Sequence, residues 1–141
     1  MSAPTEVAGK LRVALMRMVR RLKRETDGEH SVSVIAALGS LNSHGPLTLG
    51  ELAEAEGVSR PSMTVLAASL LDQNLIAKKP DPTDGRLVRV HINQAGKRVL
   101  EQSRTRRNAY LAKRLAALSG DELRTLDEAA TILLRLVEKG S

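Results

Sequence analysis

The chain has 141 residues, which is enough for one domain with a sizeable hydrophobic core. It carries 22 Lys and Arg against 16 Asp and Glu, and the net charge of +6 favours an anionic partner such as nucleic acid or acidic lipid. Cys is absent, which excludes disulfides and thiol chemistry, and Tyr110 is the only aromatic residue, so the core must be aliphatic. No apolar run is long enough to span a membrane, and arginines interrupt the apolar positions of residues 1–30, so we expect a cytoplasmic protein without a signal peptide.

A basic amphipathic helix is predicted over residues 7–24. Its apolar positions recur at steps of three and four and form one stripe. They are Leu11, Leu15, Met18 and Leu22. The stripe can pair with a second copy of the chain, or the helix can lie on acidic lipid, and the absence of Trp and Phe favours pairing. Asp27 and Gly28 form the turn signal that breaks the helix within residues 25–30.

Ser31 is placed to cap a second helix. The spacing of Ile35, Leu38 and Leu41 predicts that these side chains face inward. The next residues, 42–46, combine Asn, Ser, Gly and Pro, and they predict a loop after this helix.

A pattern of two closely spaced helices follows. Thr48 and Glu51 have the spacing of a capping box, in which each side chain bonds to a free backbone N–H of the other residue. Gly57 suits the left-handed residue that ends a helix, so the first helix is predicted over residues 49–56. After a turn of three residues, Ser59 caps the second helix. Two helices joined by so tight a turn are typical of a helix-turn-helix.

The second helix of this pair has no charged residue between Arg60 and Asp72. Its apolar arc, which is expected to face the core, consists of Met63, Leu66, Ala67, Leu70, Leu71 and Asn74. The opposite arc consists of Pro61, Ser62, Val65, Ala68 and Asp72. Ser62 and Thr64 can bond to base edges or phosphates, and Val65 or Ala68 can contact a thymine methyl, so this arc is predicted to read DNA. Packing of the same arc against another helix is the alternative.

Residues 75–79 and 87–92 are predicted to be strands. In the second of them Val88, Val90 and Ile92 occupy alternate positions, which is the period of a half-buried strand. The turn formers of Pro-Asp-Pro-Thr-Asp-Gly between the strands predict a loop longer than a two-residue turn. A helix-turn-helix followed directly by such a hairpin is a winged helix.

Two further helices are predicted over residues 94–117 and 120–138. Ser119 and Glu122 repeat the capping-box spacing at the start of the last helix. That helix carries a single apolar stripe. The stripe consists of Leu123, Leu126, Ala130, Leu133 and Val137.

The order of these elements resembles the MarR family of bacterial transcriptional regulators over almost the whole chain. The most specific part is TLGELAEAEGVSRPSMTVLAASLLDQNLIAKKPDPTDGRLVRVHINQAG, in which Asp84-Gly85-Arg86, a strand and Asn93-Gln94-Ala95-Gly96 look like the family's wing signature. The resemblance implies that Asp84 orients Arg86 into the minor groove of DNA. It also implies an obligate homodimer built from the terminal helices, a pseudo-palindromic operator, and release by a small, often phenolic, effector.

The sequence therefore predicts a mainly α protein with a small β-hairpin, an α+β winged helix-turn-helix. We expect one domain over residues 1–141, with the winged-helix core at 31–92 and dimerisation helices at 5–26 and 94–139. The predicted DNA-binding residues are Ser59, Arg60, Pro61, Ser62, Thr64, Val65, Ala68, Lys78, Lys79, Asp84, Arg86 and Arg89. The predicted dimerisation residues are Leu11, Leu15, Met18, Leu123, Leu126, Leu133 and Val137.

The function that this pattern favours is sequence-specific binding of double-stranded DNA by a dimeric repressor, without enzymatic activity or a membrane partner. The sequence has no phosphate-binding Gly loop and no nucleophile elbow. Asp81 and Asp84 lack the further oxygen ligands of a calcium loop, and the three His lack metal-ligand spacing, so we expect no metal and no cofactor. Two alternatives stay open: an architectural DNA-binding protein with little sequence preference, and a dimerising protein-interaction module.

Overall fold

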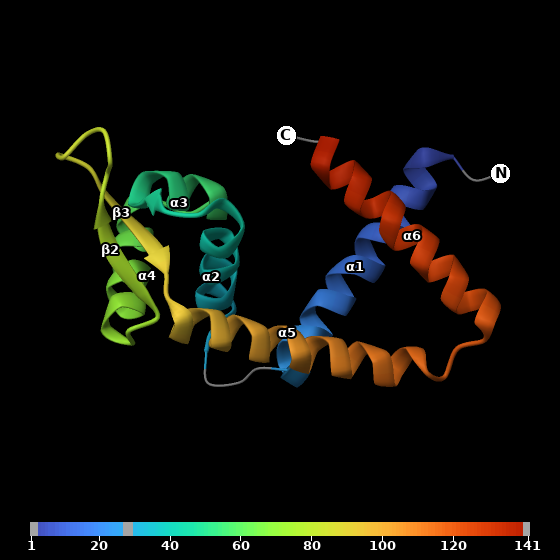
Figure 1. The fold of residues 1–141 in the computed structure, drawn as a ribbon. Helices are drawn as coiled ribbons and strands as arrows, with labels where there is room; N and C mark the ends of the chain where they lie inside the picture. Colours follow the sequence, from blue (N-terminus) through green and yellow to red (C-terminus); the bar gives the residue numbers. More distant parts are fainter. Residues whose placement is uncertain (1–2, 27–29, 140–141) are drawn as a thin grey trace. The chain divides into compact units, whose positions relative to one another are not determined.

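The computed structural model describes residues 3–26 and 30–139 of the chain. Its elements follow the order expected for a winged helix with flanking helices (Figure 1). They are α1 (Pro4–Thr26), α2 (Val32–His44), β1 (Leu47–Thr48), α3 (Leu49–Glu56), α4 (Arg60–Asp72), β2 (Ile76–Pro80), β3 (Val88–Ile92), α5 (Gln94–Leu115) and α6 (Gly120–Lys139). The predicted fold class, mainly α with a small β-hairpin, is confirmed. The chain divides into two compact units, and the boundary between them falls within α5, after Arg107.

The strands of the described residues form one antiparallel sheet in the order β1-β3-β2. The β2–β3 hairpin was predicted, with β2 shifted by one residue and β3 shorter by one residue at its start. β1 lies on the other edge of β3, where Thr48 pairs with Arg89. This strand was not predicted, because two residues are too few to show an alternating pattern.

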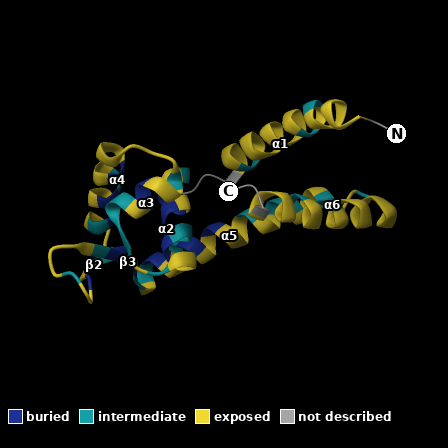
Figure 2. Ribbon diagram, turned by 90° about the horizontal axis from the view of Figure 1, so that it is seen from above, coloured by how far each residue is buried: buried dark blue, intermediate teal, exposed yellow. Residues whose placement is uncertain are grey.

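Apolar side chains of α2, α3, α4, the sheet and the start of α5 form one hydrophobic core (Figure 2). Ile35, Leu38 and Leu41 face into it from α2, as the sequence predicted. The contribution of α4 consists of Met63, Ala67 and Leu70, with Leu66 and Leu71 packed at its margin. The apolar arc of α4 is therefore confirmed, except at its last residue.

That last residue, Asn74, was expected on the apolar arc, but it is exposed and has a φ of 60° in the turn after α4. Its carbonyl oxygen accepts a hydrogen bond of 2.8 Å from the side-chain amide of Asn93. The side-chain oxygen of Asn93 in turn accepts one of 2.9 Å from the N–H of Gly96 in the first turn of α5. A Cβ at Gly96 would overlap the carbonyl oxygen of Leu75 and lie 2.7 Å from Cγ1 of Ile92. This junction therefore has no room for a side chain at Gly96.

The end of α2 differs from the prediction. Residues 42–44 were expected in a loop, but they continue the helix. The helix ends at Gly45, which has a φ of 78° and donates its N–H to the carbonyl oxygen of Leu41 at 3.0 Å. The physical stop signal is thus the glycine, which adopts a positive φ without steric cost, and not the polar residues before it.

Three smaller differences concern element ends. α1 continues to Thr26, and the predicted turn at Asp27 and Gly28 lies outside the described residues. α5 ends at Leu115 instead of residue 117. Val88 was expected to face the core, but it is 51% exposed, because it belongs to the last pair of the hairpin and lines the hollow between the hairpin and α4.

The two terminal helices expose apolar side chains along most of their length, which Figure 2 shows as yellow ribbons. On α1 these include Leu15 and Met18, and on α6 they include Leu123, Leu126 and Val137, of which Val137 is 77% exposed. The predicted capping box of α6 is present, with bonds of 3.0 and 3.1 Å between Ser119 and Glu122. Within the described ranges, no helix is both long enough and apolar enough to cross a membrane.

Candidate nucleic-acid interface

The helix-turn-helix is fixed by local signals at three helix ends. Thr48 and Glu51 form the predicted capping box at the start of α3, with bonds of 3.0 and 3.1 Å. Gly57 ends α3 in the left-handed conformation, with a φ of 66°. Ser59 caps α4 and accepts a bond of 3.2 Å from the N–H of Ser62. These signals set the angle at which α4 leaves the turn, and each was predicted from the sequence.

The surface of α4 that faces away from the core is uncharged between Arg60 and Asp72, the two exposed charged residues at its ends. Pro61, Ser62, Val65 and Ala68 are all exposed, and Val65 has 73% of its surface accessible. The other side of α4 is well packed, so an exposed valine at this position can make an apolar contact with a binding partner. The structure therefore places the predicted reading arc of α4 in solvent and does not pack it against a helix of the same unit.

The hydroxyl groups of this surface are partly organised by the helix itself. Ser59 donates its hydroxyl hydrogen to the Ser62 oxygen at 2.9 Å. Thr64 donates its own to the carbonyl oxygen of Arg60 at 3.0 Å, which leaves the Thr64 oxygen able to accept a bond from a partner. The first turn of α4 thus presents oriented donors and acceptors on a rigid backbone.

Asp81 organises the wing, a name used below for β2, β3 and the connecting wing loop of residues 81–87. Its Oδ1 accepts bonds of 2.8 and 2.9 Å from the N–H groups of Thr83 and Asp84. Its Oδ2 accepts a bond of 2.6 Å from Nε of Arg89. The bond from Arg89, followed by those backbone N–H groups, holds the pKa of Asp81 well below the usual carboxyl range. The side chain is only 5% exposed, so its charge acts inside the wing.

Asp84 and Arg86 are in contact at the tip of the wing, as the family resemblance implied. Oδ1 of Asp84 accepts bonds from the backbone N–H and from Nε of Arg86, at 3.0 and 3.2 Å. Nη2 of Arg86 lies 3.4 Å from the other carboxylate oxygen. The Arg86 side chain is nevertheless 92% exposed, so the guanidinium is oriented on one side and open to a partner on the other.

Arg89 has a role that the sequence did not indicate. Besides its bond to Asp81, it donates from Nη1 to Oε1 of Glu51 at 2.7 Å, and that same oxygen caps the backbone N–H of Thr48. Sequence reasoning grouped Arg89 with the phosphate-binding residues, because the partner Glu51 becomes adjacent only when β1 pairs with β3. Glu51 and Asp81 were likewise missed as members of the site, since no sequence spacing relates them.

A groove of about 440 Å³ lies between α4 and the wing. Its cationic side chains are Arg60, Lys78 and Arg86, which come from three different elements or loops. Besides Arg60, α4 contributes the uncharged residues Thr64, Ala67, Ala68 and Leu71. Lys79 lies instead on the opposite face of the hairpin beside Asp81 and Arg89, because adjacent strand residues alternate faces. The predicted set of wing cations is therefore divided between two faces.

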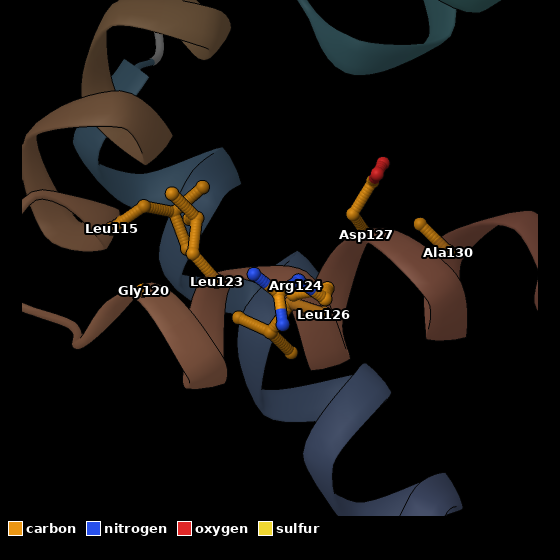
Figure 3. Close-up of a pocket in the computed structure, with 7 residues that line it drawn as sticks. All are labelled: Leu115, Gly120, Leu123, Arg124, Leu126, Asp127 and Ala130. Carbon is orange, nitrogen blue, oxygen red and sulfur yellow. The ribbon is translucent and has the colours of Figure 1, made fainter.

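A second hollow, of about 700 Å³, lies along α6 (Figure 3). Leu115 contributes to it from the end of α5, and the remaining lining residues belong to α6. Two of them, Leu123 and Leu126, are predicted dimerisation residues, and Arg124 and Asp127 are its charged members. Among the described residues, no three His, Asp or Glu side chains gather in the geometry of a metal site.

The comparison with known proteins agrees with this geometry. The MarR family model matches residues 31–88. An uncharacterised HTH-type transcriptional regulator of Mycobacterium leprae is 35% identical over 140 residues, which cover 99% of this chain and 98% of that protein. The HTH-type transcriptional repressor MdtR of Bacillus subtilis is 31% identical over 101 residues, which cover 72% of this chain and 63% of that protein.

The fold is also known from solved structures. A MarR family protein of Bacillus stearothermophilus superposes with a TM-score of 0.81 at 22% identity, over 98% of this chain and 100% of that chain. Sequence similarity over nearly the full length and the winged-helix geometry lead to the same conclusion. The chain belongs to the MarR family of winged helix-turn-helix transcriptional regulators, and it is a DNA-binding regulator of transcription.

Proposed function

We propose that this protein represses transcription by binding, as a homodimer, a pseudo-palindromic operator in double-stranded DNA. The observation that carries the proposal is the groove between α4 and the wing, where Arg60, Lys78 and Arg86 lie beside Thr64 and Ala68, two exposed and uncharged residues of α4. A polyanion with readable base edges matches this combination of cations and small side chains. The relation to MdtR, which is named a repressor, supports repression over activation.

Within the interface, α4 supplies specificity. Ser62 and Thr64 bond to base edges or phosphates, and Val65 and Ala68 contact thymine methyl groups in the major groove. The start of α4 directs the backbone N–H groups of Ser59 and Arg60 at a phosphate, which the positive end of a helix favours. Pro61 has no N–H and contributes through the surface of its ring, and the N–H of Ser62 already donates to Ser59.

The wing and the flanking cations supply affinity. Arg60, Lys78 and Lys79 neutralise phosphates, which gives the salt-dependent part of binding. Arg86, oriented by Asp84, enters the minor groove, where a narrow A·T-rich duplex has an enhanced negative potential. Residues 31–92 contain six acidic and five basic side chains, so this region has no excess of positive charge. The face that binds DNA is therefore determined by where the basic side chains lie and not by how many there are.

The terminal helices form the dimer in this proposal. The apolar stripe of α6 leaves Leu123, Leu126 and Val137 between 46% and 77% exposed in the single chain. Pairing with the same surfaces and the α1 stripe of a second copy would bury these side chains and stabilise the dimer. Residues 1–141 act as one domain of a cytoplasmic regulator that is not an enzyme, with a winged-helix core at 31–92 and dimerisation helices at 5–26 and 94–139. A small-molecule effector that releases the operator completes the scheme.

In vitro selection from duplexes with a randomised central region tests the function. The enriched DNA should contain two related half-sites about 10 base pairs apart, since two recognition helices of a dimer meet successive major grooves. Fluorescence anisotropy on that duplex should show tight binding that survives competition by random DNA. Equal affinity for selected and random duplexes would instead identify an architectural DNA-binding protein. Absence of any binding at low salt would favour a protein-interaction module.

A further inference from the structure

A continuous series of hydrogen bonds and ion pairs runs from the start of α3 to the tip of the wing. Glu51, in the first turn of α3, accepts from Arg89 at 2.7 Å. Arg89, on β3, donates to Asp81 at 2.6 Å, and Asp81 accepts from the N–H of Asp84 at 2.9 Å. The carboxylate of Asp84 then holds the guanidinium of Arg86 at 3.2 Å. Each link joins the next, so the orientation of Arg86 depends on a residue in the helix-turn-helix.

The pairing of strands brings these residues together. Thr48 of β1 lies opposite Arg89 of β3, and Glu51 is the capping partner of Thr48. The ladder between β2 and β3 ends with the pair of Pro80 and Val88. Beyond that pair, the ordering of the wing loop depends on its own bonds. Asp81 is a partner in those to Thr83, Asp84 and Leu87, and Asp84 is a partner in those to Arg86 and Leu87.

Arg86 and Arg89, the two arginines of the wing, differ in how far their side chains are exposed to solvent. The Arg86 side chain is 92% exposed, whereas that of Arg89 is 26% exposed. Two nitrogen atoms of Arg89 already donate to carboxylates in charge-assisted bonds, which are stronger than neutral ones. An arginine held in this way is suited to fixing geometry and poorly placed to take a phosphate.

We propose that Arg89 is a positioning residue for DNA binding, which fixes the wing against α3 through Asp81 and Glu51 so that Arg86 is presented to the minor groove. The proposal rests on the DNA-binding function inferred above. Removal of Arg89 leaves two carboxylates without their shared cation and releases the wing loop from α3. Its effect on DNA affinity therefore passes through Arg86 and disappears when Arg86 is already absent.

A double-mutant cycle on the duplex selected by the wild-type protein tests this dependence. Arg89→Met and Arg86→Ala should each weaken binding by about 10-fold or more, the scale of one good contact to DNA. In the double variant the losses should overlap, so that it binds about as well as Arg86→Ala alone. The matched control is Lys79→Met, which removes the same charge from the position opposite Arg89 on β2 and should add fully to Arg86→Ala.

Amide hydrogen exchange measured without DNA provides an independent readout. Arg89→Met should accelerate exchange at Thr83 and Asp84, whose N–H groups bond to Asp81, and leave the core helices α2 and α4 unchanged. If that variant does not fold, Asp81→Asn opens the same ion pair from its other end and enters the same cycle.

The outcomes separate the two proposals. Overlapping losses with faster exchange in the wing loop support the positioning role. Additive losses, or unchanged affinity of Arg89→Met, overturn it and leave the DNA-binding function intact. A wild-type protein that selects no duplex and binds none at low salt overturns the proposed function itself.

Discussion

Arg86 donates three hydrogen bonds to Asp84 and still exposes 92% of its side chain. Removal of the side chain should therefore cost little folding stability, because a solvent-exposed ion pair contributes little. Arg86→Ala should weaken operator binding and lower the slope of log affinity against log salt by about one charge unit. Fluorescence anisotropy across a salt series measures both quantities. Arg86→Lys serves as the control, since it keeps the charge and should keep most of the slope. An unchanged affinity for Arg86→Ala at every salt concentration would show that the wing tip does not contact DNA.

Val65 tests the other kind of contact, because it is proposed to make an apolar contact with DNA whereas Arg86 makes a charged one. Val65→Ala should change base preference more than the salt slope, since no charge is removed. Stability should stay the same or rise slightly, because Val65 is 73% exposed and Ala is the better helix former. Selection on randomised duplexes, together with thermal denaturation, measures the two effects. Met63→Ala, two residues away on the buried side of α4, is the contrasting variant and should lose about 2 kcal/mol or more of folding free energy. An unchanged preference for Val65→Ala would remove this residue from the reading surface.

The lowered pKa of Asp81 should make the folding stability depend on pH in a specific way. Its folded-state pKa lies below the ordinary value of about 3.9, so its contribution is fully present above about pH 4. The contribution is lost as the pH falls through the folded pKa and the carboxylate becomes protonated. The difference in unfolding free energy between the wild-type protein and Asp81→Asn should be constant near neutral pH and shrink under strongly acidic conditions. Denaturant titrations at pH 7 and pH 3 measure this difference. A gap of equal size at both values would mean that the charge of Asp81 does not order the wing.

Leu133 lies in the apolar stripe of α6 and tests the dimer. Leu133→Asp would place a charge in the proposed interface between copies and should cost several kcal/mol of dimer stability. Dimerisation and operator binding should be lost together, although no residue of the DNA face has changed. Thr131→Asp, an exposed position outside the stripe, is the control and should preserve both. Sedimentation and anisotropy on the same samples decide the question. A wild-type monomer that binds a full operator tightly would contradict the model, as would a Leu133→Asp dimer of normal stability.

The parts of the fold that could be predicted from sequence are those that local chemistry specifies. Both capping boxes, the glycine that ends α3 and the apolar arc of α4 depend on residues within one or two helical turns of each other. The arrangement around Arg89 could not be predicted in this way. It requires β1, which is too short to have a period, and it joins Glu51, Asp81 and Arg89, which are far apart in sequence.

The features of the candidate site also fall into those that local sequence patterns could predict and those that they could not. The reading arc of α4 follows from a helical period, and the Asp84–Arg86 contact spans only two residues, so both were found from sequence. The groove that joins Arg60 to Lys78 and Arg86 is set by the packing of α4 beside the wing. No spacing in the sequence encodes that packing. It depends on buried residues that carry no functional chemistry, such as Met63 and Leu70, which share one core with Val90 of the sheet.

Gly96 should tolerate no side chain, because α5 begins in contact with the backbone of Leu75, the residue just before β2. In Gly96→Ala the new Cβ would overlap the carbonyl oxygen of Leu75 and lie 2.7 Å from Cγ1 of Ile92, so the start of α5 must move. Overpacking of this kind costs about 1–3 kcal/mol, and it should exceed the gain in helix propensity. Gly39→Ala in α2 is the matched control, since nothing lies within 4 Å of its Cβ position and alanine should stabilise the helix by up to about 1 kcal/mol. Thermal denaturation should therefore move the two midpoints in opposite directions. Equal or rising stability of Gly96→Ala would show that α5 does not approach the sheet as closely as this junction requires.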